Sequence, residues 1–410
     1  MTLDTAQTAP GGANIKAIGL VSGSHLYSHY YLLLLPPLFP LLKETFGVGY
    51  LELGWSITVL NIVTGFLQAP AGFLVDKVGA RTLLIAALIV ESLAFCVIGL
   101  VPVYWVLIAM MVVAGCANAI YHPADYAILN ASVGEKHMGR AFSVHTSAGF
   151  LGGFLAPVTA GVLAKWVGWE MAIVICASTG ILMAAIMIAG SDVLSDVTER
   201  DHRENTPVKT GKTGWALLLT IPVIMGVLFY VGLSSFGHAL GSFGVATLDQ
   251  ITDSEYATLV FIISLYLFAN PVGVLAGGWV ADNIKRHDLF AAGCLVTLAI
   301  LFGLLAGFSL PIVVITVILV LAGLLNGVVA PSRDMLIRAM TPPRDVGKVF
   351  GFVSTGFNIG GIVAPPAFGY LLDNSDPTYV FWAGGLICLA IVPTVLFTGA
   401  QGRKIKARAQ

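Results

Sequence analysis

Residues 82–101 read TLLIAALIVESLAFCVIGLV, a run of twenty residues in which Glu91 is the only charged side chain. About 20 apolar residues are needed for a helix to cross the ~30 Å hydrocarbon core of a bilayer, so this run predicts a membrane-spanning helix. Of the 410 residues, 57% are hydrophobic and 10% are charged. Soluble proteins carry about 25% charged residues, because their surface faces water. The composition therefore predicts an all-α integral membrane protein and excludes a soluble enzyme, a nucleic-acid-binding protein and a secreted disulfide scaffold.

Similar apolar runs recur along the chain and predict twelve transmembrane helices. They cover residues 15–40, 51–75, 82–101, 104–131, 140–164, 169–190, 215–247, 256–280, 289–308, 311–338, 347–372 and 378–400. One long polar stretch, residues 191–214, is expected to be a cytoplasmic linker between two six-helix bundles, residues 15–190 and 215–400. Residues 1–14 are expected to be disordered, and residues 401–410 form a basic cytoplasmic tail.

The basic residues predict the orientation of the chain in the membrane. With the N-terminus in the cytoplasm, 18 Lys and Arg residues fall in inner segments and 2, Lys43 and Lys165, fall in outer loops, while Arg333 lies within a span. Because cytoplasmic segments are enriched in Lys and Arg, both termini are expected to be cytoplasmic. This places a multi-pass protein in the inner or plasma membrane, with the lipid bilayer as its surroundings and no nucleic-acid partner.

The two halves of the sequence repeat each other. A shift of 208 positions aligns the fourth and fifth spans with the tenth and eleventh without a gap, and glycine, asparagine and proline positions coincide. The matching pairs include Gly115 and Gly323, Asn118 and Asn326, Pro123 and Pro331, Gly152 and Gly360, and Pro157 and Pro365. Parallel repeats of six helices are typical of transporters that hold their substrate between the halves near the membrane midplane. One chain with this internal symmetry is expected to function as a monomer.

A ten-residue stretch after the second span carries a family resemblance. Residues 72–81 read GFLVDKVGAR. The residues of this stretch that carry the resemblance are Gly72, Asp76, Lys77, Gly79 and Arg81. The stretch resembles the signature loop between helices two and three of the major facilitator superfamily, although Ala80 stands where the family usually has a basic residue. A shortened copy runs from Gly278 through Asp282 to Arg286. Two stretches are similar to the fosmidomycin-resistance-like branch of that family. They are residues 25–29, HLYSH, with the proline-rich segment that follows, and residues 121–123, YHP.

The resemblance implies a gating role for the signature loop. Asp76 is expected near the N-terminus of the eleventh helix, where unpaired amides carry about half a positive charge. Lys77 and Arg81 would make further contacts at the same cytoplasmic end of these helices. Such contacts would favour the outward-facing state. The alternative is a charge cluster that sets topology and has no gating role.

Polar residues inside the spans predict the transport site. An ionisable side chain in a span costs about 2.5–3.5 kcal/mol on insertion scales, so each needs a partner or a function. The resemblance implies that spans one, four, seven and ten line the cavity, and most such residues lie there. The candidate cavity residues are His25, His29, Tyr30, Asn118, Tyr121, Asp125, His238, Asn326 and Arg333. His145 and Asn358, on spans five and eleven, can also reach the cavity.

The candidates for proton coupling are His25, His29, His122, Asp125 and Glu91. His25 and His29 lie one turn apart on one helix face. They could relay protons or bind substrate, coordinate a transition metal, or serve only as packing residues in the helix bundle. We assign no metal site and no cofactor. Glu91 is either a coupling group or a buried hydrogen-bonded group.

The repeat places Asp125 and Arg333 at equivalent positions in the two halves. They are expected either to pair across the cytoplasmic side of the cavity or to leave Arg333 free to bind an anionic substrate. A structural salt bridge within one half is the alternative. Asp334 is not expected to neutralise Arg333, because adjacent helical residues point about 100° apart.

The seventh span is rich in glycine, at Gly232, Gly237, Gly241 and Gly244. Glycine lowers helix stability by about 1 kcal/mol relative to alanine, which predicts a soft outer half that bends as a gate. Close packing through small residues is the alternative.

These features predict a secondary active transporter that moves a small anionic organic solute by alternating access with proton coupling, and that has no catalytic residues. The chain has no GxxxxGK[ST] nucleotide-binding motif, so its energy would come from a gradient. The main alternative is a proton-driven drug or antibiotic efflux antiporter. A metal-ion transporter, a membrane-embedded enzyme and a receptor of transporter ancestry are weaker alternatives.

Overall fold

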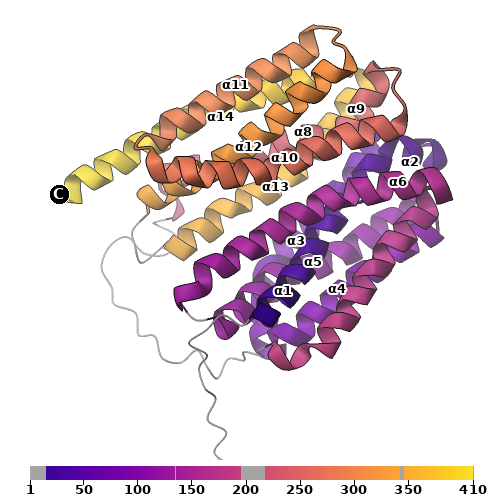
Figure 1. The fold of residues 1–410 in the computed structure, drawn as a ribbon, viewed down its shortest axis with the longest axis horizontal. Helices are drawn as coiled ribbons and strands as arrows, with labels where there is room; N and C mark the ends of the chain where they lie inside the picture. Colours follow the sequence, from indigo (N-terminus) through magenta and orange to yellow (C-terminus); the bar gives the residue numbers. More distant parts are fainter. Residues whose placement is uncertain (1–14, 134, 195–217, 342–345, 410) are drawn as a thin grey trace, which may run out of the picture.

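The computed structural model describes residues 15–133, 135–194, 218–341 and 346–409, and the regular structure of these residues is helical (Figure 1). Residues 1–14 and most of the expected linker, residues 195–214, lie outside the described residues. The N-terminal elements are α1 (Ile15–Leu32), the 3₁₀ turn η1 (Pro36–Leu38), α2 (Phe39–Phe46), α3 (Tyr50–Val78), α4 (Ala80–Leu100), α5 (Tyr104–Ser132), α6 (Glu135–Ala189) and η2 (Ser191–Val193). The C-terminal elements are α8 (Ile221–Gly241), α9 (Gly244–Ile251), α10 (Tyr256–Asn283), α11 (His287–Gly307), α12 (Ile312–Ala339), α13 (Val346–Asn374) and α14 (Tyr379–Ala409).

These helices confirm the twelve expected spans. Within the described residues, nine helical segments are long and apolar enough to cross a membrane. One of them belongs to α6, which holds two crossings joined at Gly168, a glycine with φ of 79°. Only glycine adopts such a positive φ without strain, so the chain can reverse there. Helices α1 and α13 lie where the other two spans are expected and pack inside the bundles, although they are not among the nine segments.

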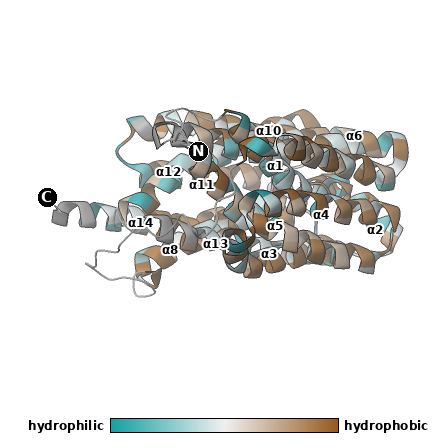
Figure 2. Ribbon diagram, turned by 90° about the horizontal axis from the view of Figure 1, so that it is seen from below, coloured by the Kyte–Doolittle hydropathy of each residue, from teal (hydrophilic) through white to brown (hydrophobic). Residues whose placement is uncertain are grey.

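The helices form two bundles, and each bundle packs largely within itself. Helices α1 to α6 make one bundle, called here the N-half, and α8 to α14 make the other, the C-half (Figure 1). Apolar residues cover the length of both bundles (Figure 2), and large apolar side chains such as Phe73 and Leu275 are exposed. Lipid tails can cover these surfaces, whereas water could not.

The repeat seen in the sequence is also present in the packing. A Cβ atom added at Gly115 would lie 2.9 Å from the carbonyl oxygen of Leu60 on α3. A Cβ atom at the equivalent Gly323 would collide with the carbonyl oxygen of Tyr266 on α10. Both glycines therefore let the fourth helix of a half touch the backbone of its second helix.

Two expected spans are broken rather than continuous. The first span, residues 15–40, becomes α1, η1 and α2, because Pro36 and Pro37 lack the amide hydrogen that a continuing helix needs. The seventh, residues 215–247, divides between α8, which ends at Gly241, and α9, which begins at Gly244. Gly232 and Gly237 lie inside continuous helix.

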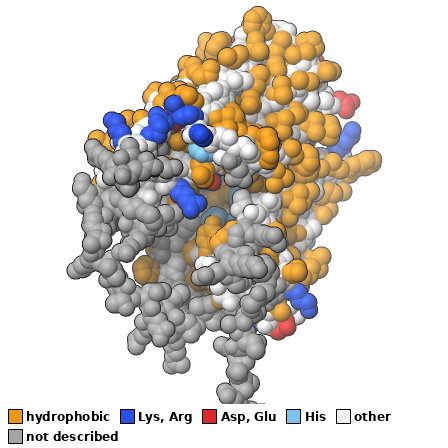
Figure 3. Space-filling view, turned by 60° about the vertical axis from the view of Figure 1, so that its left-hand side comes forward, with side chains coloured by type: hydrophobic (Ala, Val, Ile, Leu, Met, Phe, Trp, Pro, Cys, Tyr) orange, Lys and Arg blue, Asp and Glu red, His pale blue; other side chains and the backbone are white. Residues whose placement is uncertain are grey.

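The two halves meet along α3 with α13 and along α6 with α10. We call the end where α3 joins α4 and where α14 terminates the linker end, and the end that holds α2 and α9 the opposite end (Figure 1). In the space-filling view the linker-end face is recessed, with Lys and Arg side chains beside the recess (Figure 3).

Candidate functional site

The centre of the candidate site is Asp125 on α5, which is fully buried. Its Oδ2 atom lies 3.3 Å from Nδ1 of His25 on α1 and 3.7 Å from Nε2 of His145 on α6. Both imidazoles are also buried. Three helices of the N-half thus bring one carboxylate and two imidazoles together inside the membrane-spanning part of the chain.

Two more histidines complete the group. The ring centroid of His25 lies 4.8 Å from that of His29, 5.3 Å from that of His122 and 3.8 Å from that of His145. We call His25, His29, His122, Asp125 and His145 the histidine–aspartate cluster. The structure therefore joins four proton-coupling candidates, two from α1 and two from α5, and sequence spacing did not predict that the two pairs meet.

A glycine on α6 makes this approach possible. A Cβ atom at Gly149 would lie 2.8 Å from Cδ2 of His29 and 2.9 Å from Nε2 of His25. A larger residue would displace the imidazoles of His25 and His29. His145, one turn earlier on α6, can then stack on His25 with ring planes 25° apart.

Several polar atoms of the cluster have no hydrogen bond of regular geometry to any described residue. They are Nδ1 of His25, Nδ1 of His122, both ring nitrogens of His145 and both carboxylate oxygens of Asp125. A buried polar group without a partner costs about 1–3 kcal/mol. The cluster therefore has donor and acceptor capacity left over, which suits it to bind a proton or a polar ligand.

A metal ion is a less suitable occupant than a proton. Ring nitrogens of His25, His122 and His145 lie within 4.8 Å of one another, which is close enough to consider one transition metal. Zinc, however, needs nitrogens at about 2.0–2.1 Å whose lone pairs converge on the ion. Nδ1 of His25 and Nε2 of His145 both face Oδ2 of Asp125, at 3.3 and 3.7 Å, so a carboxylate oxygen already occupies the point on which these two nitrogens converge. A proton shared between the carboxylate and an imidazole needs no convergence.

Arg333 on α12 has different surroundings: in the described residues it pairs with Asp334 and not with Asp125, whose pairing with Arg333 was one of two expected arrangements. Its Nε donates to Oδ1 of Asp334 at 2.8 Å, and Tyr230 on α8 donates its hydroxyl to the same oxygen at 3.0 Å. The guanidinium carbon lies 4.6 Å from the ring centre of Tyr230 and 5.4 Å from that of Phe357. The expectation that Asp334 would not neutralise Arg333 is wrong, because the long arginine side chain reaches the carboxylate of its neighbour.

The other predicted cavity residues bond within their own half. Asn118 donates to Oε1 of the buried Glu91 at 3.2 Å, which fits the interpretation of Glu91 as a hydrogen-bonded group. The remaining bonds pair Tyr30 with Thr159, Asn326 with Asn270, and His238 with Ser242, while Tyr121 is buried. These residues position helices, and none of these bonds joins the two halves.

The signature loop is described in part. Gly79 has φ of 108° and stands between α3 and α4, which explains the glycine at this position of the motif. Arg81 donates from Nη1 to the carbonyl oxygen of Ser191 at 3.2 Å, within the N-half. The side chains of Asp76 and Asp282 lie outside the described residues.

His145 is the residue that the sequence prediction weighted too little. It was expected only to reach the cavity, yet it stacks on His25 and faces Asp125. A signal was available, because His145 is the only ionisable residue between Arg140 and Lys165.

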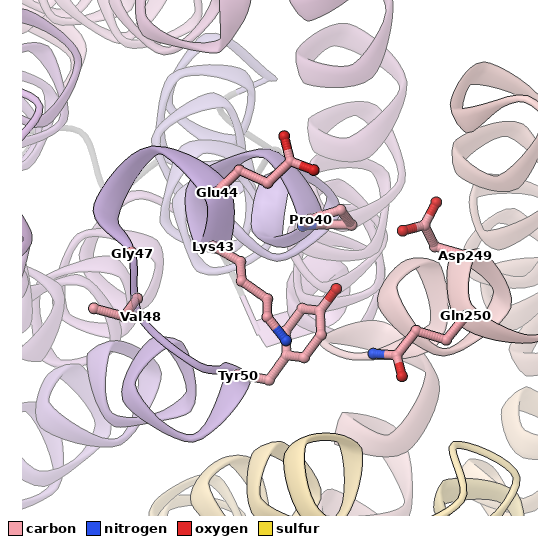
Figure 4. A pocket seen from close by; sticks show the side chains of 8 residues that line it. All are labelled: Pro40, Lys43, Glu44, Gly47, Val48, Tyr50, Asp249 and Gln250. Carbon is pink, nitrogen blue, oxygen red and sulfur yellow. The ribbon is translucent and has the colours of Figure 1, made fainter.

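A pocket of about 510 Å³ lies at the opposite end, away from the cluster. Lys43 and Tyr50 of the N-half line one side, and Asp249 and Gln250 of the C-half line the other (Figure 4). The halves therefore come close enough at this end to enclose space between them.

Comparison with known proteins identifies the family. The sequence model of the Major Facilitator Superfamily matches residues 22–306 and 234–409. The D-galactonate transporter of Escherichia coli O6:H1 is 24% identical over 364 residues, which cover 81% of this chain and 83% of that protein. The fosmidomycin resistance protein of Escherichia coli K12 is 23% identical over 396 residues, covering 92% of this chain and 91% of the relative.

Solved structures agree on the fold. A bacterial homologue of the human lysosomal transporter Spinster, in an inward-facing and unoccupied conformation, matches with a TM-score of 0.72 at 12% identity and covers 95% of this chain and 96% of its own. The twelve-helix architecture, the duplicated halves and the family match lead to one conclusion. This chain belongs to the Major Facilitator Superfamily and is a multi-pass membrane transporter, not an enzyme.

Proposed function

We propose that this transporter moves a small anionic organic solute together with protons by alternating access. The histidine–aspartate cluster of the N-half takes the proton, and Arg333 of the C-half takes the anionic group. The observation that carries the proposal is the contact of Asp125 with His25 and His145, because three buried polar side chains meet there without regular hydrogen bonds.

The proton assignment rests on the position of the carboxylate between two imidazoles. A charge buried without a compensating partner is costly, so Asp125 favours either a proton or a charged imidazole beside it. Because His25 and His145 stack at 3.8 Å, charging both rings would place two positive charges face to face. The cluster therefore favours one exchangeable proton over several fixed ones. Movement of α1 or α6 would change the distances from the imidazoles to Asp125, and would therefore change the affinity of the cluster for that proton.

The anion assignment rests on the exposure and chemistry of Arg333. Its side chain is 16% exposed while that of Asp334 is 46% exposed, so water screens the carboxylate more than the guanidinium. The bond to Asp334 uses Nε, which leaves the two terminal nitrogens as the fork that binds a carboxylate or phosphonate. The guanidinium carbon lies 4.6 Å from the ring centre of Tyr230 and 5.4 Å from that of Phe357, and these two rings contact each other, so the aromatic pair supports the guanidinium from one side. The relative named for D-galactonate, a carboxylate, supports this substrate class.

We further propose that the linker end is cytoplasmic, which places both termini inside the cell and the chain in the inner or plasma membrane. The excess of basic residues at that end supports this orientation. Contacts between the halves at the opposite end then correspond to a closed outer side and an inward-facing state. Since both halves lie in one chain, a monomer can carry out the cycle.

Drug efflux is the second candidate, favoured by the likeness to the fosmidomycin resistance protein. The two candidates differ in the direction of exchange. A solute–proton symporter accumulates its solute on the side toward which protons flow. An efflux antiporter moves its drug against the flow of protons.

The test begins with thermal stabilisation of the purified protein by a panel of carboxylates and phosphonates, including D-galactonate and fosmidomycin, and of neutral and cationic drugs. The stabilising compound is then supplied to proteoliposomes with an acidic exterior. Accumulation inside that an ionophore abolishes supports symport of an anion. Stabilisation by neutral or cationic drugs alone, or transport that ignores the pH gradient, would contradict the proposal.

A further inference from the structure

Asp373, at the end of α13 in the C-half, binds the beginning of α3 in the N-half. Its Oδ1 accepts a hydrogen bond from the amide of Tyr50 at 2.9 Å, and its Oδ2 accepts one from the amide of Leu51 at 2.7 Å. Lys43 on α2 adds an ion pair to Oδ1 at 3.3 Å. The side chain of Asp373 is 17% exposed, so this group is partly shielded from water.

These two amides open α3 and have no acceptor within their own helix. The first four amides of any helix lack intrahelical partners and are usually capped by the side chain of the preceding residue. Here that residue is Gly49, which has no side chain to cap with. Glu52 accepts from the amide of Gly49 at 2.9 Å, which leaves the amides of Tyr50 and Leu51 for Asp373. The C-half thus supplies the cap that the N-half lacks.

The glycines along this seam fit the same contact. A Cβ atom at Gly49 would lie 2.5 Å from Oδ2 of Asp373, and one at Gly54 would lie 2.6 Å from the carbonyl oxygen of Pro365. A Cβ atom at Gly369 on α13 would collide with the carbonyl oxygen of Tyr50. The backbones of α3 and α13 therefore touch at the opposite end, which brings the carboxylate onto the helix terminus.

Helices α3 and α13 pack together and run in opposite directions. At the opposite end α3 begins and α13 ends, whereas at the linker end α3 ends and α13 begins. Asp76 belongs to the last turn of α3, and the resemblance of its loop to the family signature implies the N-terminus of α13 as its partner. Each helix therefore carries, close to its C-terminal end, a carboxylate suited to cap the start of the other.

We propose that Asp373 is a positioning residue for transport, which closes the outer gate by capping α3, and that it alternates with Asp76. The proposal rests on the alternating access proposed above. Outward opening would part α3 from α13 at the opposite end and strip Tyr50 and Leu51 of their acceptor. Inward opening would part the same helices at the linker end and release Asp76. One antiparallel helix pair would then hold a cap at either end, but only one cap at a time.

The test measures the width of the outer gate directly. Spin labels are placed at Glu44 on α2 and Gln250 on α9, two exposed positions on opposite walls of the pocket in Figure 4, in a chain without its native cysteines. Electron–electron double resonance then reports the distances between the halves. For Asp373→Asn we expect the population at long distances to rise roughly fivefold, the scale of a lost helix cap.

The matched control is Asp376→Asn, three residues further along. Asp376 accepts hydrogen bonds from the amide and hydroxyl of Thr378 at 2.9 and 2.6 Å, within its own loop. This control should leave the distances unchanged. An equal widening in both variants would attribute the effect to the loop and overturn the proposal.

A second pair of variants removes the donor instead of the acceptor. Tyr50→Pro deletes one capped amide at the first helical position, where proline is tolerated, and the preceding Gly49 has φ of −87° and ψ of 175°, which suits a residue before proline. Tyr50→Phe keeps the amide and the ring. We expect widening only in Tyr50→Pro. Unchanged distances in both Tyr50→Pro and Asp373→Asn would overturn the proposal, and because no solute is added, this result is separate from any failure of proton coupling.

Discussion

Asp125 and Arg333 occupy equivalent positions of the two repeats, yet their surroundings differ completely. Asp125 is fully buried among imidazoles, and neither of its oxygens has a regular hydrogen bond to a described residue. Arg333 lies over two aromatic rings and is bonded to a neighbour that is half exposed. The N-half position is buried and lacks regular hydrogen bonds, whereas the C-half position is hydrogen-bonded and partly exposed to water.

The two halves of the duplication therefore keep the same helix packing, but the side chains at equivalent positions have different chemistry. Gly115 and Gly323 still bring equivalent helices into contact. The side chains one turn or more beyond those glycines diverged into a group that favours an exchangeable proton and a group that favours a fixed anion. The variants below test whether the two halves divide the work in this way.

The largest effect is expected from Asp125→Asn. Without a titratable group between His25 and His145, accumulation against a gradient should fall to the equilibrium level, while solute exchange between two equally loaded compartments continues. Proteoliposome uptake and counterflow measure the two quantities. Glu91→Gln is the matched control, because Glu91 is a buried carboxylate of the same half that is bonded to Asn118 instead. Loss of accumulation in the control alone would move the coupling site to α4.

Asp76→Asn and Asp373→Asn should bias the molecule in opposite directions. Loss of the cap at the linker end favours the inward-facing state, and loss of the cap at the opposite end favours the outward-facing state. Both variants should be expressed normally but transport severalfold more slowly, since a helix cap contributes about 1 kcal/mol. Accessibility of an engineered cysteine from each side of the membrane checks the direction. A shift of both variants toward the same state would show that the two caps do not alternate.

Arg333→Lys should weaken solute binding with little change in proton coupling. Lysine keeps the charge but loses the planar fork, so the solute concentration for half-maximal transport should rise roughly tenfold. Arg338→Lys, an exposed position one turn further along α12, should transport like the parent protein. An unchanged solute affinity in Arg333→Lys would place the anion elsewhere.

The smallest effect is expected from Tyr230→Phe. This change removes the hydroxyl that donates to Asp334 but keeps the ring beneath the guanidinium. A hydrogen bond contributes about 0.5–1.5 kcal/mol, so the half-saturating concentration should change only a few fold. Tyr230→Leu, which also removes the cation–π contact, should cost more. Equal behaviour of the two variants would mean that the ring does not hold Arg333.

The sequence was sufficient to predict the fold because the bilayer imposes a length and a polarity on every span. The twelve helices, the internal repeat and the family followed from apolar runs, from matching glycines and from the motif at residues 72–81. The breaks after Leu32 and Gly241 were harder to place. Prolines and glycines mark where a helix weakens, but tertiary packing decides where it ends.

The candidate site could be predicted only residue by residue. His25, His29, His122 and Asp125 stood out because ionisable groups in spans are costly. Their meeting with His145 depends on how closely α6 approaches α1, which Gly149 permits and which spacing along the chain does not reveal. The expectation that Asp334 would not pair with Arg333 was wrong for a related reason, since the direction of a Cβ atom does not fix where a long side chain ends.

The division of work between the halves is tested most directly by counting protons that enter with the solute. A pH-sensitive dye trapped in proteoliposomes records acidification when the solute found in the stabilisation screen is added. We predict that Asp125→Asn exchanges solute without acidification, whereas Arg333→Lys keeps the parent ratio of protons to solute at a higher solute concentration. Acidification by Asp125→Asn at the parent ratio would contradict the account.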